Sequence, residues 1–229
     1  MSKKNKKASF SFSDFLSELK ENSVSTPKNI EKFEERKYFL IVCEGERTEP
    51  AYFNYFKKLL PKQLLDTIQI QGEGDNTINI VNKAIQLKEE RKLNILLPNY
   101  DEAWAIFDKD DFPSERYNEA VRLAGENDIN SGHSNQSFEL WYILHFEFLQ
   151  SALHRSDYIK KLTNHLGFKY EKNDTRVVEY LFKNCNIERA IHWAKELDSL
   201  HEGTSVSNAC PHTKVYELVE KLREYCEPV

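Results

Sequence analysis

Acidic residues follow two apolar segments of this chain. The apolar segments are residues 38–43 and 104–107, and the residues that follow them are Glu44-Gly45-Glu46 and Asp108-Lys109-Asp110-Asp111. Both segments are typical of buried strands, and the carboxyl ends of buried parallel strands are where ligands and metals gather. Carboxylates that converge there repel one another unless a hard cation neutralises them, so the pattern indicates Mg²⁺ and phosphate chemistry. The alternative is that two acidic turns simply follow two core strands.

The local spacing adds detail to this hypothesis. Asp108 and Asp110 are two residues apart, so in an extended segment both side chains point to the same side and can bind one metal or bracket two. Gly45 lets the backbone turn sharply after Glu44 and lets a ligand approach closely. A helix beginning near Thr48 would present free N–H groups that could hold a phosphate.

Composition sets limits on the class of protein. The chain has 229 residues, of which 40% are hydrophobic, so it can form one domain with extensions or one large and one small domain. The formal net charge is −5, and without the four lysines of residues 1–7 the remainder has 28 basic and 37 acidic residues. That basic arm could touch phosphates, or it could be a solvated tail.

The cysteines and the apolar runs bear on location. Four scattered cysteines, no secretory signal pattern and no apolar run of membrane length indicate a cytoplasmic protein without a membrane partner. A zinc site around Cys210 and His212 is conceivable, but the spacing matches no usual ligand pattern.

Strand and helix patterns alternate along the first two thirds of the chain. The expected strands are 38–43, 67–71 and 103–107, with a further short strand within 127–132; the expected helices are 49–60, 77–91 and one that Pro113 opens and Gly125 closes. This alternation predicts an α/β fold with a mainly parallel sheet covered by helices on both faces.

The character changes after residue 133. Segment 134–146 is predicted to be a helix capped by Ser134 or Asn135, and residues 208–213 are predicted to be the entry and cap of a final helix. Further helices are expected at 187–200 and 213–226, and a short amphipathic one at 10–19. We therefore expect an N-terminal extension (1–30), an α/β domain (37–150) and a helical C-terminal portion (151–229) packed on it.

Four ordered segments carry a resemblance to a known family. They are residues 41–50, 72–77, 107–111 and 134–145. A glutamate-glycine pair after one strand and an Asp-x-Asp after another resemble the TOPRIM domain of topoisomerases, bacterial primases and OLD-type nucleases. More narrowly, the four segments are similar to the RloB-like family, which is associated with bacterial restriction and phage-defence loci, over residues 37–225. The resemblance implies a TOPRIM-like sheet.

The resemblance also implies roles for individual residues. Glu44 would be a metal ligand or general base, Asp108 and Asp110 would be Mg²⁺ ligands, and Asp111 and Glu46 would serve a second metal or position water. Glu139 would face the same site, the alternative being an exposed helix glutamate.

His145 would act as an acid or a phosphate ligand, the alternative being a core histidine. Gly45, Arg47 and Lys109 lie beside the acids and could contact a scissile phosphate, although both basic residues could equally be ordinary surface charges.

These roles predict an enzyme. The leading hypothesis is a nuclease that depends on Mg²⁺ or Mn²⁺, cuts RNA (including tRNA) or DNA in anti-phage defence, and is controlled by an AAA-type ATPase partner. The alternative is a metal-binding regulatory subunit that is not catalytic. Nucleotidyl transfer is disfavoured because no nucleotide-binding segment is evident, and the chain has no Gly-x-x-x-x-Gly-Lys-[Ser/Thr] loop. No tyrosine has a context that suggests strand passage.

Overall fold

The computed structural model describes residues 36–60, 68–74 and 76–226. The predicted N-terminal extension, with its basic arm and its helix at 10–19, lies outside the described residues. So does Thr67, where the second strand was expected to begin.

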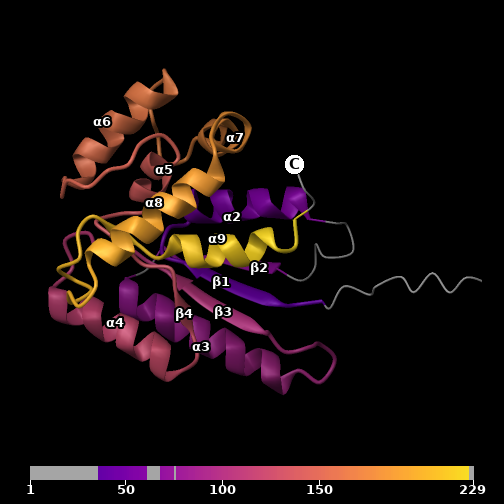
Figure 1. Ribbon diagram of the computed structural model, residues 1–229. Coiled ribbons are helices and arrows are strands. Elements are labelled where there is room, and N and C mark those ends of the chain that lie inside the picture. The colour runs from indigo at the N-terminus through magenta and orange to yellow at the C-terminus, as the bar shows by residue number, and fades with distance from the viewer. Residues whose placement is uncertain (1–35, 61–67, 75, 227–229) are drawn as a thin grey trace, which may run out of the picture. The chain divides into compact units, whose positions relative to one another are not determined.

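Four parallel strands form the central sheet, in the order β2-β1-β3-β4 (Figure 1). They are β1 (Phe39–Cys43), β2 (Ile68–Gly72), β3 (Glu102–Ile106) and β4 (Asn130–Ser131). Cys43 pairs with Gly72 on one side and with Ile106 on the other, so the three longer strands end level with one another. The predicted α/β fold with a parallel sheet is confirmed.

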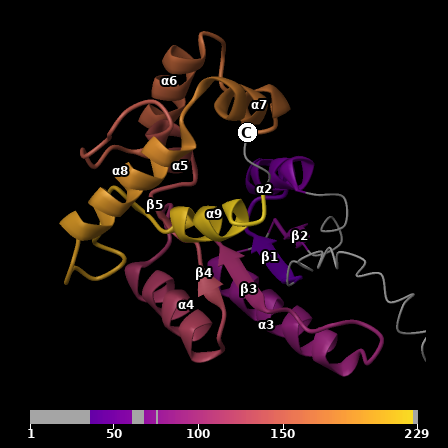
Figure 2. The same ribbon diagram turned by 45° about the vertical axis from the view of Figure 1, so that its right-hand side comes forward.

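Helices cover both faces of the sheet, which explains why its strands are apolar without alternation. Side chains of Leu40 and Val42 pack against α3 (Thr77–Leu93) and α4 (Ser114–Glu126) on one face. Those of Phe39 and Ile41 belong to a second core on the other face, with α2 (Thr48–Leu59) and the C-terminal helices (Figures 1 and 2).

The C-terminal part of the chain is helical, as predicted. Its helices are α5 (Glu139–Leu144), α6 (Arg155–Leu166), α7 (Thr175–Asn184), α8 (Ile187–Leu200) and α9 (Val215–Arg223). The buried ring of Tyr52 lies at the centre of their packing against α2. Its centroid is 5.3 Å from that of Phe182 on α7 and 6.2 Å from that of Trp141 on α5. Among the described helices, none is both long and apolar enough to cross a membrane.

The prediction of a capped helix over 134–146 is wrong for its first half. Ser134 and Asn135 form a short strand, β5, that pairs antiparallel with β6 (His212–Thr213), and the helix begins only at Glu139. The Ser134 hydroxyl meets the Thr213 hydroxyl at 3.0 Å instead of capping a helix. Ser134 and Asn135, which are residue types that commonly cap helices, therefore pair here with His212–Thr213, a segment far along the chain.

Residues 212–213, expected to cap the final helix, form β6 instead, and the N-cap of α9 is Lys214, without a side-chain cap hydrogen bond. Thr213 Oγ1 does accept a hydrogen bond from the Val215 N–H over 3.3 Å at the start of α9. In α4, Gly125 lies inside the last turn, because the helix runs one residue further, to Glu126.

We expect Trp141→Ala to lower the free energy of unfolding by about 3–5 kcal/mol, because Trp141 is fully buried among aromatic rings. Trp193→Ala is the matched control, since Trp193 is only partly buried and stacks on Phe148 at the surface of the same core. Urea unfolding followed by circular dichroism measures both. Equal losses for the two variants would contradict the burial argument.

Candidate functional site

Glu44 and Asp108 are joined directly at the carboxyl edge of the sheet. Glu44 follows β1, Asp108 lies two residues beyond β3, and the Asp108 N–H donates to Glu44 Oε2 over 3.0 Å. Asp108 Oδ2 in turn accepts the Phe138 N–H over 3.0 Å. The predicted convergence of these two carboxylates is therefore present, and it also anchors the segment that leads into α5.

Asp110 also lies near Glu44 and Asp108, but not through the extended geometry that the two-residue spacing was taken to predict. Its backbone has a φ of 40°, in the left-handed region, and its N–H donates to the Gln136 carbonyl over 2.9 Å. Its negative charge raises the pKa of both Glu44 and Asp108. Oδ1 of Asp110 is buried and has no hydrogen-bond partner within the described residues.

Arg155 bridges the two outer aspartates. From the start of α6, Nη1 is 2.7 Å from Asp110 Oδ2 and Nη2 is 2.7 Å from Asp111 Oδ2. The Asp111 side chain is largely exposed, so it marks the outer rim of the acidic group. One guanidinium thus supplies a positive charge at the position where the sequence predicts a metal.

Two further glutamates complete the acidic group. Glu49, in the first turn of α2, is buried and packs against Gly45 so closely that a Cβ at Gly45 would lie 2.0 Å from Glu49 Oε2. Glu139, at the start of α5, is only 2% exposed, so it is not an exposed helix glutamate. We call Glu44, Glu49, Asp108, Asp110 and Glu139 the carboxylate cluster.

Glu139 is held by partners from two segments. It accepts hydrogen bonds from Ser137 Oγ over 2.6 Å and from the Tyr170 hydroxyl over 3.0 Å. Lys172 Nζ lies 3.5 Å from Glu139 Oε1 and is exposed at the rim. Burial alone would lower the pKa of Lys172, but Glu139, Asp108 and Asp110 outweigh it, so the pKa is raised and the ammonium stays charged.

Burial of these carboxylates close to one another raises their pKa values. Burial, reinforced by the charges of neighbouring carboxylates, raises the pKa of Glu44 to about 7 and that of Glu49 to about 7. The pKa of Asp108 is raised well above its usual range, first by burial and then by the charges of Glu49 and Glu139. The cluster is therefore short of positive charge when all its members are ionised.

Other predicted residues lie beside the cluster and do not belong to it. Arg47 and Glu46 line a cavity of about 390 Å³ together with Lys172, and Glu46 also packs on Gly74. The Lys109 ammonium donates to the Phe112 carbonyl three residues along the chain, which is the behaviour of an ordinary structural lysine.

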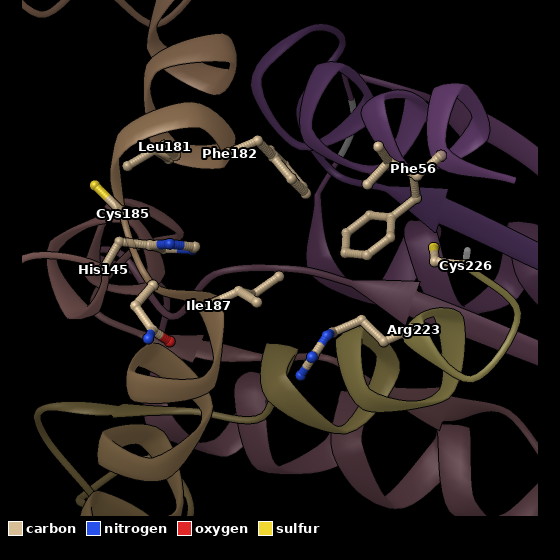
Figure 3. A pocket seen from close by; sticks show the side chains of 10 residues that line it. Phe56, His145, Leu181, Phe182, Cys185, Ile187, Arg223 and Cys226 are labelled. Carbon is tan, nitrogen blue, oxygen red and sulfur yellow. The ribbon is translucent and has the colours of Figure 1, made fainter. Parts of the chain in front are cut away.

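His145 belongs to the aromatic core. It lies at the other end of α5 from Glu139, a separation of about 9 Å along a helix axis. Its Nε2 is 3.4 Å from the Tyr52 hydroxyl, and burial, with the nearby Arg189 charge, lowers its pKa to about 3. The ring faces a separate cavity of about 620 Å³ that is lined mainly by apolar side chains (Figure 3). The structure therefore does not bring His145 to the carboxylates.

The donor chemistry of the cluster suits a hard divalent cation, because every donor is a carboxylate oxygen and Asp110 keeps one buried oxygen unpartnered. Within 36–60, 68–74 and 76–226, no three Asp, Glu, His or Cys side chains are already arranged as a metal-ligand set. This holds for the region of Cys210 and His212 as well, where His212 Nε2 is instead 2.9 Å from Asp198 Oδ1.

Sequence reasoning missed Glu49 as a member of the cluster, and it missed Arg155, Tyr170 and Lys172 altogether. Glu49 stands in the same segment as Glu44 and at a helix start, where an acidic residue is common for reasons unrelated to a site. The other three lie in segments without any motif, and only the tertiary fold brings them to Glu139 or Asp110.

With EDTA present, we expect the free energy of unfolding to fall as pH rises from about 5 to about 8. The pKa of Glu49 is about 7 in the folded protein against an ordinary 4.5, so between these values the folded state binds more protons than the unfolded state. Glu49→Gln removes the charge and should be more stable than wild type at about pH 8, by an amount on the order of 2 kcal/mol. Urea unfolding at both pH values measures this.

The control for that prediction is Glu119→Gln, a substitution of an exposed glutamate on α4. It should keep the pH dependence of the wild type. If Glu49→Gln has the same pH dependence as well, the carboxylate of Glu49 is not the source of the instability.

We expect Gly45→Ala to lower the free energy of unfolding by about 1–3 kcal/mol, since the new Cβ collides with the buried Glu49 carboxylate. Gly125→Ala is the matched control: nothing lies within 4 Å of its Cβ position, so it should be neutral or stabilise by about 0.4–1 kcal/mol. Combining Gly45→Ala with Glu49→Ala should cost less than the sum of the single changes. Strict additivity would show that the two residues do not interact.

Comparison with known proteins gives a family match. The family model described as RloB-like protein matches residues 39–222, from the first residue of β1 to the penultimate residue of α9. No curated protein and no solved structure matches the chain. Because the family match extends over most of the 229 residues, the chain belongs to the RloB-like family.

Proposed function

We propose that this protein is a nuclease dependent on Mg²⁺ or Mn²⁺, with the carboxylate cluster as its active site and a TOPRIM-like use of the sheet edge. The observation that carries the proposal is the excess of negative charge at this edge. The pKa values of Glu44, Glu49 and Asp108 are all raised, and among the described residues the basic side chains paired with members of the cluster are Arg155 and Lys172 at its rim. Such a cluster favours a divalent cation that would balance it.

In this proposal Asp108 and Asp110 would hold the metal, Glu44 would be a further ligand or the general base, and Asp111 would serve a second metal or position water. A bound divalent cation supplies an activated water at neutral pH and neutralises charge on a phosphodiester. In the role of a base Glu44 would suit neutral pH, because without metal its pKa is about 7. Glu139 positions Lys172, whose ammonium lies at the mouth of the cluster.

The surroundings of Lys172 suit a nucleic-acid strand. Lys172 lines two cavities, one of about 390 Å³ that includes Arg47 and one of about 280 Å³ that includes Arg155 and His154. A strand passing over Lys172 and these cavities would meet further basic side chains, which is how phosphates are positioned without sequence reading. RNA, including tRNA, and DNA both carry such phosphates.

The chain has a formal charge of −5, so its net charge would not attract nucleic acid from a distance. A partner that delivers the substrate fits this charge, and we propose an AAA-type ATPase in anti-phage defence for that role, acting in the cytoplasm.

One observation favours a second candidate, a regulatory subunit that is not catalytic. Arg155 already bridges Asp110 and Asp111, so two of the proposed metal ligands share one positive charge that the protein itself supplies. A subunit of this kind would bind the cation as a structural element and leave cutting to a partner.

We expect the purified protein to cut labelled tRNA, single-stranded RNA or plasmid DNA with Mg²⁺ or Mn²⁺, and EDTA to abolish cutting. Glu44→Gln and Asp108→Asn should each lower the rate about 100-fold or more, because each removes a carboxylate that would hold the metal or accept a proton. Glu119→Gln, which changes an exposed glutamate on α4, should cut like wild type.

A thermal unfolding scan with and without Mn²⁺ separates the two candidates. Cutting that survives in Asp108→Asn would exclude the cluster as the active site. No cutting of any substrate, together with a Mn²⁺-dependent rise in melting temperature that Asp108→Asn loses, would support the regulatory subunit instead.

A further inference from the structure

The connection between α3 and β3 exposes a run of large apolar side chains. Leu93 is 83% exposed, Ile95 95%, Leu96 86% and Leu97 46%. Elsewhere in the described part of the chain, the exposed large hydrophobic side chains are the isolated Ile159 and Leu200. We call Leu93, Ile95, Leu96 and Leu97 the apolar turn. Contiguous exposed apolar surface of this kind marks an interaction site.

The apolar turn is held in one conformation by polar bonds behind it. The Asn94 side chain accepts the Leu96 N–H over 3.1 Å, and the Asn94 carbonyl accepts the Leu97 N–H over 3.2 Å. Arg91 Nε donates to the Pro98 carbonyl over 2.7 Å, and the same guanidinium lies 4.7 Å from the centre of the Tyr100 ring. A partner would therefore meet a preformed surface, which lowers the entropy lost on binding.

The charged residues beside the apolar turn include both acidic and basic side chains, so this surface is complementary in charge to a second copy of itself. The last turns of α3 carry Glu89 and Glu90 followed by Arg91 and Lys92, and Glu89 and Lys92 are paired at 2.6 Å with both side chains about half exposed. The charges of these four residues sum to zero, so the surface does not favour a partner with a strong net charge. A second copy of α3 running the opposite way about a two-fold axis would place Glu89 of one copy against Lys92 of the other, because these two residues lie one helical turn apart on the same face.

The available area agrees with such a pairing. Four side chains exposed to this extent present on the order of 400–500 Å² of apolar surface, at the upper range for one patch on a monomer. Two copies face to face would bury about 1,000 Å² in total, which is the lower limit for a specific interface. We propose that the apolar turn and the last turns of α3 form the interface of a weak, two-fold symmetric homodimer.

The position of this interface keeps the carboxylate cluster accessible. The apolar turn precedes the first residue of β3, whereas Asp108 follows the last one, so the two lie at opposite ends of the parallel strands (Figure 2). A strand of five residues separates them by about 17 Å. The dimer would therefore expose two clusters that face away from each other, and the inference does not depend on what the clusters do.

Sedimentation velocity of the full chain, from low to high micromolar concentration, tests the proposal. Wild type should change from monomer to dimer over this range, and Ile95→Asp/Leu96→Asp should weaken dimerisation about tenfold or more. Leu200→Asp is the matched control: Leu200 is 61% exposed on α8, away from α3, and its replacement should leave dimerisation unchanged. Because the replaced side chains are exposed, all variants should keep the melting temperature of wild type when it is measured at a concentration where wild type is monomeric.

A charge exchange tests the two-fold geometry. Glu89→Lys and Lys92→Glu should each weaken the dimer, and the double exchange should restore it, because opposite charges then face each other again. A wild type that stays monomeric over the whole range overturns the proposal. So does a dimer that Ile95→Asp/Leu96→Asp leaves intact, or one in which the double exchange is weaker than either single change.

Discussion

The burial of several carboxylates at one edge of the sheet is the constraint on which the rest of the structure depends. Each carboxylate that leaves water must accept hydrogen bonds or face a positive charge, since burial without partners is costly. Here the donors come from distant segments: the Asp108 N–H donates to Glu44, the Phe138 N–H donates to Asp108, and the Tyr170 hydroxyl donates to Glu139. The hydrogen bonds that stabilise the buried carboxylates therefore also attach the C-terminal helices to the sheet.

The architecture was largely predictable because the sheet is buried on both of its faces, and a strand of such a sheet is apolar at every position. Residues 39–43 are apolar at every position, which excludes a strand with one wet face, and helix-spaced apolar residues between the strands require crossovers. Ser134 and Asn135 were assigned wrongly because a polar pair before an apolar run has the same appearance whether it caps a helix or pairs with a distant strand. Only the partner, His212–Thr213, distinguishes the two cases, and it lies more than seventy residues away.

The site was predictable where its residues follow strands and not where they come from helices and loops. Glu44, Asp108 and Asp110 were identified because parallel strands end at one edge and so fix the neighbourhood of whatever comes next. Arg155 and Lys172 belong to no strand end, and a single basic residue among 32 carries no signal until the fold places it beside an aspartate or glutamate. His145 shows the converse: it stands in a family-like segment, but a turn and a half of helix directs it to the core.

The short helix α5 has a consequence for how this chain can be divided. All six of its residues are buried, and Glu139 at its start is bonded to Tyr170, while Asp110 is bonded to Arg155. The acids thus come from before residue 150 and their counter-charges from after it. A chimaera of two family members joined near that point would inherit the acids from one parent and the groups that balance them from the other. We therefore expect the parts before and after residue 150 to be exchanged between family members only together.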